Sequence, residues 1–242
     1  MIIAAFVAGA QNALAGGGSF LTFPALLYAG LDPRAANITS SIALFPAQVT
    51  TGLSNHDLLS GAAGLSVRAL ILISLIGGAL GALLLLATPV SIFTRLMPYL
   101  VLFATLVFVW GNFFRKSRGA GADPRINPLA AGIVQFLIAL YGGYFGGGIG
   151  ILMMATFTTA GMALRHAAAT KNMLASVMGG SSVLIFVIEV KFDWHIVLSF
   201  AVAAVLGGQM GVFLVRRINE TALRIAITAV GAALTIALFS RS

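Results

Sequence analysis

Two glycine triplets, Gly16-Gly17-Gly18 and Gly146-Gly147-Gly148, interrupt long apolar stretches of the chain. Three adjacent residues without a Cβ atom disfavour an α-helix, so we expect each stretch to break there. Broken backbone at membrane depth is tolerated only where it is buried in protein or lines a watery cavity, because lipid cannot hydrogen-bond the freed N–H and C=O groups. Each helix that restarts, at Ser19 and at Ile149, directs its unpaired N–H groups and its positive dipole end into that cavity. The triplets therefore predict a site for an anion.

Close helix packing is the alternative interpretation of glycine in such a chain, because spaced small residues let helix backbones approach each other. The pairs Gly77/Gly81 and Gly207/Gly211 fit that interpretation. The triplets differ, since they recur at matching positions in two halves of the chain. Paired interruptions of this kind indicate the binding site of a transporter.

The composition limits the class of protein. Of the 242 residues, 60% are hydrophobic and 8% are charged, and the mean hydropathy is +1.04. These values predict an all-α polytopic membrane protein rather than a soluble domain. The net charge of +8 is better explained by basic residues between membrane spans, next to the lipid bilayer, than by binding to nucleic acid. We expect the first apolar segment to be structural, since no basic region precedes it.

The second half of the chain repeats the order of the first. Arg34 aligns with Arg165, and Gly77-Gly78 aligns with Gly207-Gly208. The sequence therefore predicts two repeats of about four helical elements, each opening with a glycine-broken helix. The predicted boundaries are 1–112 for the first repeat, 113–127 for a hydrophilic linker and 128–242 for the second repeat.

The basic residues distinguish two architectures. If each broken stretch crosses the membrane fully, these residues divide almost evenly between the two faces. If each is a re-entrant hairpin, only four lie on one face, namely Arg34, Arg95, Lys191 and Arg241. The hairpin fits better, because short cytoplasmic loops are enriched in Lys and Arg. It leaves three full crossings per half, which inverts the halves and brings the glycine breaks together near the midplane. Both architectures place the linker in the cytoplasm.

Lys171 is the ionisable residue that we expect in the site. It lies beside Thr170 and Asn172 in a predicted membrane segment, where a charge is costly enough to indicate function. A lysine that extends to the headgroups from near a helix end is the alternative. Ser40 occupies the matching place in the first repeat, so the site would carry one cation. The predicted substrate-binding residues are polar residues and glycines around the two breaks: Gln11, Asn12, Gly16, Gly17, Gly18, Ser19, Thr39, Ser40, Tyr144, Gly146, Gly147, Gly148, Thr170, Lys171 and Asn172.

Signatures of catalysis and of cofactor binding are weak. The chain has no G-x-S-x-G, H-E-x-x-H or P-loop lysine motif, and it has no cysteine for a thiolate metal site. We therefore expect no enzyme activity, no metal and no cofactor. An intramembrane hydrolase would need an activated nucleophile, which these motifs do not provide.

The stretch from Gln11 to Leu27, the segment Ala36–Ser40, and Gly142–Gly150 with Lys171-Asn172 resemble the TauE/SafE family, often called sulfite exporters. One departure is Ile38, where many relatives carry a small residue. The resemblance covers nearly the whole chain. It implies a transporter of about eight spans that moves sulfite or small organosulfonates across the bacterial inner membrane.

The expected function is secondary transport of a small sulfur-containing anion, such as sulfite or sulfoacetate, with export as the expected direction. A passive anion channel, which uses the same helix dipoles without alternating access, stays open, as does transport of a non-sulfur organic anion. Coupling to protons and assembly as a homodimer also stay open.

Overall fold

The computed structural model describes residues 2–14, 17–54, 56–110, 127–190, 193–214 and 220–240. The predicted linker and Gly16 therefore lie outside the described residues, apart from Asn127 at the linker's end. Within these ranges the chain forms ten α-helices, a one-turn 3-10 helix and no strand. The helices are α1 (Ile2–Leu14), α2 (Ser19–Tyr28), α3 (Pro33–Leu53), η1 (His56–Leu58), α4 (Val67–Ala87), α5 (Val90–Val109), α6 (Pro128–Tyr144), α7 (Ile149–Thr159), α8 (Leu164–Glu189), α9 (Trp194–Leu214) and α10 (Glu220–Phe239). The all-α prediction is confirmed.

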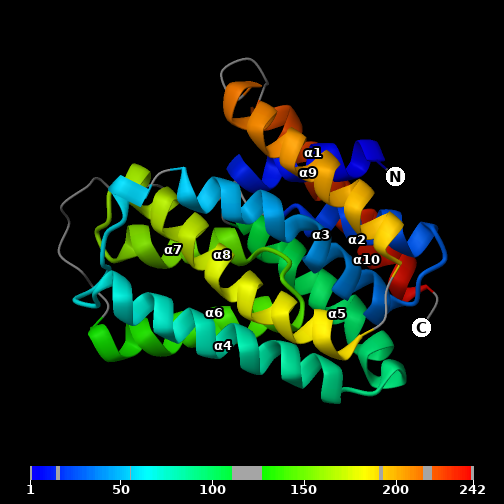
Figure 1. The fold of residues 1–242 in the computed structure, drawn as a ribbon, viewed down its shortest axis with the longest axis horizontal. Helices are drawn as coiled ribbons and strands as arrows, with labels where there is room; N and C mark the ends of the chain where they lie inside the picture. The colour runs from blue at the N-terminus through cyan, green and yellow to red at the C-terminus, as the bar shows by residue number, and fades with distance from the viewer. Residues whose placement is uncertain are drawn as a thin grey trace.

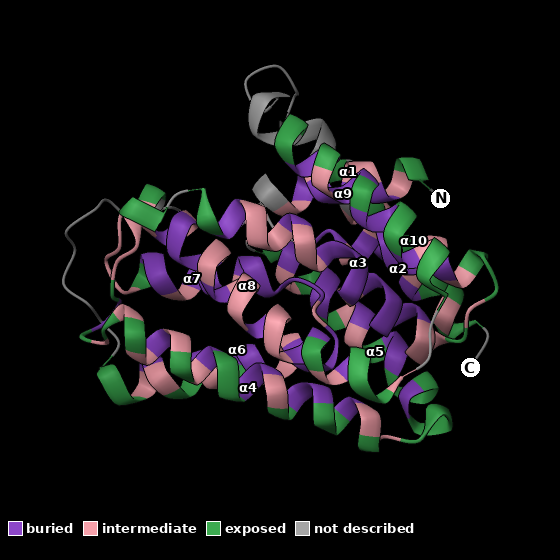
Figure 2. Cartoon of the chain, viewed as in Figure 1, coloured by how far each residue is buried: buried purple, intermediate pink, exposed green. Residues whose placement is uncertain are grey.

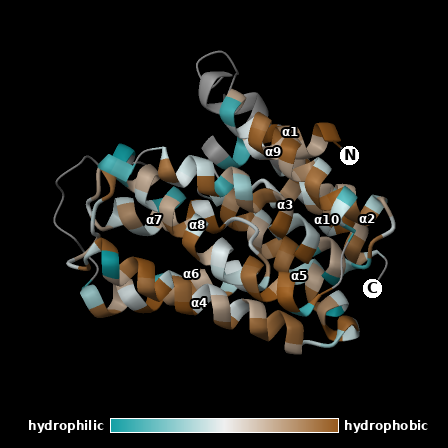
Figure 3. Cartoon of the chain, in the orientation of Figure 1, coloured by the Kyte–Doolittle hydropathy of each residue, from teal (hydrophilic) through white to brown (hydrophobic). Residues whose placement is uncertain are grey.

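The outer surface is apolar. In the described part of the chain, three helices are long and apolar enough to cross a membrane: Val67–Ala87, Val90–Val109 and Arg165–Glu189. Large apolar side chains such as Ile76 and Leu83 are about half exposed on α4. Apolar residues run along the exposed faces of the helices (Figures 2 and 3). Spans of this length and composition suit the hydrocarbon core of a bilayer.

The halves of the chain exchange helices. α1 packs mainly against α9, and α6 packs mainly against α4, so the opening helix of each half lies on a helix of the other. Between these two pairs, α3 packs against α8. Figure 1 shows α1 and α9 along one side of the molecule, α4 and α6 along the other, and α3 and α8 in the middle. Each contact has its counterpart in the other half, which supports the predicted duplication.

Glycines allow the exchanged helices to approach closely. A Cβ atom on Gly207 would collide with the carbonyl of Phe6, and one on Gly81 would collide with the carbonyl of Leu140. A Cβ atom on Gly77 would lie 2.7 Å from Ala139. The packing interpretation of Gly77, Gly81 and Gly207 is confirmed. The same prediction for Gly211 is not tested, because the surroundings of this residue lie outside the described part of the structure.

The connecting turns define two ends of the molecule. At the Arg34 end, the guanidinium of Arg34 donates to the carbonyl of Thr88, at 3.0 Å, and joins the α2–α3 turn to the α4–α5 turn. At the Ser60 end, the Thr170 hydroxyl and the Ser60 backbone exchange hydrogen bonds of 3.1 and 3.2 Å. These bonds join the start of α8 to the loop after α3. α3 and α8 therefore cross the molecule in opposite directions.

Each glycine break turns the chain back on itself. α6 starts at the Ser60 end, where a Cβ atom on Gly64 would lie 3.0 Å from the Pro128 ring. α7 then folds back along α6, with the Gln135 amide 3.7 Å from the Met153 sulfur. At the first break, a Cβ atom on Gly18 would lie 2.6 Å from the Ala8 carbonyl. These two reversals support re-entrant hairpins, and the path through a bilayer stays a prediction.

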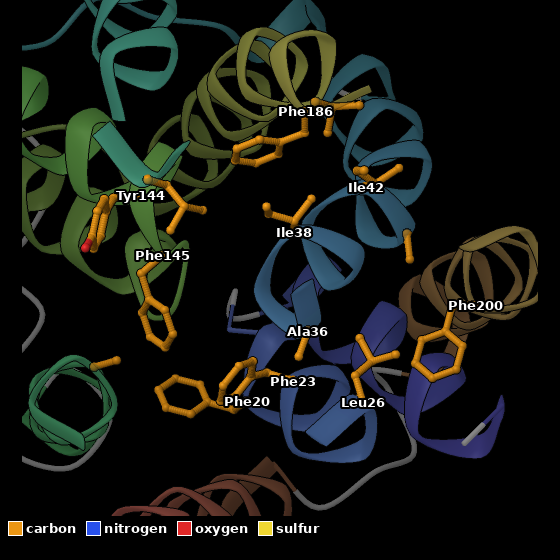
Figure 4. Packing of buried hydrophobic residues seen from close by; sticks show 14 of the residues in the cluster. Phe20, Phe23, Leu26, Ala36, Ile38, Ile42, Tyr144, Phe145, Phe186 and Phe200 are labelled. Atoms are coloured by element: carbon orange, nitrogen blue, oxygen red, sulfur yellow. The ribbon is translucent and has the colours of Figure 1, made fainter. Parts of the chain in front are cut away.

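Aromatic side chains fill the space between the two breaks. The rings of Phe23 and Phe145 meet edge to face with centroids 6.0 Å apart, and Phe20 meets Phe108 in the same manner. Figure 4 shows Phe20, Phe23 and Phe145 converging beside Ala36 of α3. This core holds the first half-helix against the second break.

Candidate functional site

The second break has backbone conformations that glycine adopts most readily. α6 ends at Tyr144, Gly146 and Gly148 have φ angles of +80° and +76°, and α7 begins at Ile149. At the first break, Gly17 has a φ angle of +89° and α2 begins at Ser19. L-residues with side chains rarely adopt these angles. The triplets are therefore used as turns between helices.

Both restarted helices begin without a side-chain cap. Gly18 precedes α2 and Gly148 precedes α7, and neither helix start receives a side-chain hydrogen bond from its cap residue. The first N–H groups of a helix have no partner within the helix, and the dipole makes this end attractive to an anion. Turn bonds satisfy some of these groups, since the Phe20 and Leu21 N–H groups donate to the carbonyls of Gly17 and Gly18, and the Ile151 N–H group donates to that of Gly148.

Two small polar cavities lie where the breaks meet α3 and α8. The Lys171 cavity has a volume of about 20 Å³ and lies nearer the Ser60 end. The Ser182 cavity has a volume of about 30 Å³ and lies nearer the Arg34 end. The first is lined by Asn12, Ser19, Gln48, Thr51, Gly146, Ile149, Gly150, Lys171, Asn172 and Ala175. The second is lined by Ser19, Ser41, Leu44, Gln48, Gly142, Gly146, Ile149, Ala175, Met178, Gly179 and Ser182.

The lining residues of α3 and α8 correspond to each other. Each of four residues on α3 has a counterpart 131 positions later on α8. The pairs are Ser41 with Asn172, Leu44 with Ala175, Gln48 with Gly179, and Thr51 with Ser182. Both cavities therefore lie where matching parts of the two halves face each other.

Lys171 is buried in the first of these cavities. Its side chain is only 2% exposed, and it makes no hydrogen bond or ion pair with the residues that the structure describes. A buried ammonium without a counter-ion is costly, and an anion or water beside it lowers that cost. Such deep burial differs from a lysine whose ammonium extends to the surface.

Neutral donors surround the ammonium. The side chains of Asn12, Ser19, Gln48 and Asn172 line the same cavity and have no hydrogen-bond partner within the described ranges. By contrast, the hydroxyls of Thr51 and Ser182 donate to carbonyls of their own helices, at 3.0 and 2.8 Å. Hydroxyl groups used in this way offer only lone pairs to a ligand. The available donors are therefore the lysine, the amides and Ser19.

Apart from Gly16, which is outside the described residues, the other predicted site residues do not line either cavity. The Gln11 amide donates to the Gly17 carbonyl at 3.2 Å, and Ser40 is hydrogen-bonded to Thr22. Thr170 holds the Ser60 loop, and the Tyr144 hydroxyl donates to Thr88. The remaining four have packing positions: Gly18 lies against Ala8, Gly147 and Gly148 lie against Ala104, and Thr39 is buried in α3. Whether any of these residues contacts a substrate stays a prediction.

Two larger hollows lie on the outer sides of α6. Their volumes are about 480 and 530 Å³, and their walls are mainly apolar, with Leu137 in one and Ile133 in the other. Walls of this kind lack the donors that an anion needs, and they suit lipid chains. In the described part of the chain, no three His, Cys, Asp or Glu side chains gather as a metal site would require.

Comparison with known proteins identifies the family of this chain. The family model described as "Sulfite exporter TauE/SafE" matches residues 1–238. The chain belongs to the TauE/SafE family. A relative from Haemophilus influenzae, "Probable membrane transporter protein", is 30% identical over 90% of this chain and 85% of its own length. The Escherichia coli K12 "Probable membrane transporter protein YfcA" is 28% identical over 97% of this chain and 87% of its own length. The chain is thus a multi-pass membrane transporter.

The list of residues predicted from sequence omits several that line the TauE/SafE cavities. Gln48 and Thr51 of α3, with Gly142, Gly179 and Ser182 of the second half, are among the lining residues. Ser41, Leu44, Gln48 and Thr51 recur at three- and four-residue spacing, which places them on one helix face. Polar residues on one face of an otherwise apolar helix could therefore have indicated from the sequence that this face lines a cavity.

Proposed function

We propose that this chain is a secondary transporter that exports a small sulfur-containing anion, sulfite or an organosulfonate such as sulfoacetate, across the bacterial inner membrane. The observation that carries the proposal is Lys171, a buried cation without a counter-ion among the described residues, in a cavity bordered by both glycine breaks. The family description, a sulfite exporter, supports the choice of sulfur oxyanions.

The anion binds against the ammonium of Lys171. The amide groups of Asn12 and Asn172 and the backbone at Gly146 border the same space, so they complete its coordination. A charge-assisted hydrogen bond is about twice as strong as a neutral one. One lysine balances a singly charged sulfonate, and the helix N-termini add positive potential for a second charge.

Alternating access fits the form of the cavities. The two cavities hold about one to three water molecules each, since a water needs about 10 to 15 Å³ of such space. Narrow cavities of this size between two exchanged halves fit a transporter that alternates between two faces. In this proposal the Ser60 end faces the cytoplasm, because Arg68 and Arg165 start the helices there.

Ligand-dependent thermal unfolding of the purified protein tests the choice of substrate. A ligand that binds the folded state raises its stability, by about 2.7 kcal/mol at a concentration 100 times the Kd. We expect sulfite and sulfoacetate to raise the Tm, and size-matched carboxylates and taurine, whose amine adds a positive charge, to raise it less. Equal effects of sulfur and carboxylate anions would overturn the sulfur preference.

Counterflow in proteoliposomes tests the transport mode. A transporter that alternates between two faces takes up labelled sulfite faster when unlabelled sulfite is trapped inside. We expect this acceleration and saturation with concentration. Uptake that is unsaturable and unaffected by internal sulfite would favour the channel.

A further inference from the structure

Gln48 lies between the two cavities. Its side chain borders both the Lys171 cavity and the Ser182 cavity, and its amide has no hydrogen-bond partner among the described residues. Its carboxamide oxygen lies over Gly179 of α8, 2.6 Å from the point that a Cβ atom on Gly179 would occupy. The carboxamide therefore fills space that the glycine of the opposing helix leaves open.

The backbone around Gln48 is held in place. The Ser176 hydroxyl of α8 donates to the Gln48 carbonyl at 2.7 Å, and Gly52 approaches Ser176 and Asn172 one turn further along. α3 and α8 are thus fastened together on one side of the carboxamide. The side-chain torsions of Gln48 can therefore change while this hydrogen bond to its carbonyl is kept.

Neither cavity is large enough for an oxyanion. At about 10 to 15 Å³ for each water, volumes of about 20 and 30 Å³ accommodate one to three water molecules, whereas sulfite has four heavy atoms. Five residues border both cavities: Ser19, Gln48, Gly146, Ile149 and Ala175. Serine, glycine and alanine are short, and the β-branched Ile149 is stiff. Gln48 is the long side chain of the five with free torsions and a polar end.

We infer that the Gln48 carboxamide is a movable wall of the anion site. It turns off Gly179 to join the two cavities into one, and its amide then donates a hydrogen bond to the bound anion. The reach of this side chain sets the largest anion that the joined site accepts. The inference rests on the proposed function, since it requires that these cavities take an anion.

The counterpart of Gln48 in the second half is Gly179, so the device is present once. A glutamine at both positions would place two carboxamides in one space. Gln48 in the first half faces Gly179 in the second half, so one carboxamide borders both cavities.

Size-selective anion binding tests this role. The Kd values of sulfite and benzenesulfonate are measured by isothermal titration for wild-type protein, Gln48→Ala, Gly179→Ala and the double variant. We expect Gln48→Ala to lower the ratio of the benzenesulfonate Kd to the sulfite Kd at least tenfold, because the wall is removed. We expect Gly179→Ala to change the sulfite Kd at least threefold in the wild-type background by displacing the carboxamide. In the Gln48→Ala background, the same change should have less than a twofold effect.

Gly180→Ala is the matched control. Its new Cβ atom would lie 3.3 Å from the Phe45 ring and would not meet Gln48, so the Kd ratio should stay as in the wild type. An unchanged ratio in folded Gln48→Ala protein, or additive effects in the double variant, would refute the role of Gln48 alone. Wild-type protein that binds neither anion would refute the proposed function together with this role.

Discussion

Ser40 and Lys171 occupy matching positions on α3 and α8, 131 residues apart, but their surroundings differ. Ser40 is buried and shares a hydrogen bond with Thr22 of α2. Lys171 is equally buried, but it lines a cavity and has no partner in the described part of the chain. The same scaffold thus holds a satisfied neutral contact in one half and an uncompensated cation in the other.

This difference gives the site a direction. α3 starts at the Arg34 end and α8 starts at the Ser60 end, so Ser40 and Lys171 lie toward opposite ends of the molecule. The positive charge is therefore displaced from the centre toward the Ser60 end. Lys171 borders only the cavity nearer the Ser60 end, whereas Gln48 borders both cavities.

The largest effect is expected in cysteine labelling, where a position should react from one face of the membrane and not from the other. The chain has no cysteine, so single cysteines at Ile2, Tyr28 and Arg68 allow labelling of one position at a time. All three residues are exposed. With a re-entrant first break, Ile2→Cys and Tyr28→Cys react from one face of the membrane and Arg68→Cys reacts from the other. Reaction of Ile2→Cys and Tyr28→Cys from opposite faces would refute the re-entrant first break.

Substitution within the two breaks is expected to abolish transport. Gly17 and Gly146 have φ angles of +89° and +80°, so Gly17→Leu and Gly146→Leu both strain the turn, and the second also fills the cavities. Export of labelled sulfite from proteoliposomes should fall to the background of empty vesicles. Gly132→Ala is the control, because its new Cβ atom would have no neighbour closer than 3.7 Å. Wild-type rates in both leucine variants would exclude the breaks from the transport path.

Removal of the cation is expected to weaken binding more than tenfold. Lys171→Met keeps much of the apolar stem but loses a charge-assisted contact, which is worth roughly 1.5 to 3 kcal/mol. Lys171→Arg should retain part of the affinity. The measurement is the sulfite Kd of each variant at matched protein quality, with Ser40→Ala as the control at the corresponding position. An unchanged Kd for Lys171→Met would leave the helix N-termini as the main source of positive potential.

The breaks and the buried lysine could be predicted from sequence because both contradict their surroundings. Three glycines in an apolar helix, and a lysine among apolar residues, each need a structural reason. The roles of Ser40, Thr170 and Tyr144 could not be predicted, since a polar residue within one helix turn of the cavity can equally well bond a neighbouring helix. Their partners Thr22, Ser60 and Thr88 are 18 to 110 residues away in the chain. Gln48 was missed because its significance depends on the glycine that faces it, which only the packing of α3 on α8 reveals.

The smallest effect is expected at the neutral contact. Thr22→Val leaves the buried Ser40 hydroxyl without its partner, which costs about 1 to 3 kcal/mol of stability. Ser40→Ala should cost less, because the Thr22 hydroxyl keeps the Gly18 carbonyl at 3.4 Å. The double variant removes both hydroxyls, so its free energy of unfolding should lie closer to that of the wild type than the sum of the single effects. The sulfite Kd should stay within twofold in all three variants, because neither residue lines a cavity. Thermal unfolding in detergent gives the stabilities, and titration gives the Kd. A tenfold loss of sulfite affinity in Ser40→Ala without a change in Tm would place Ser40 in the site beside Lys171. Both halves would then contact the anion, and Ser40 would not be only a packing contact.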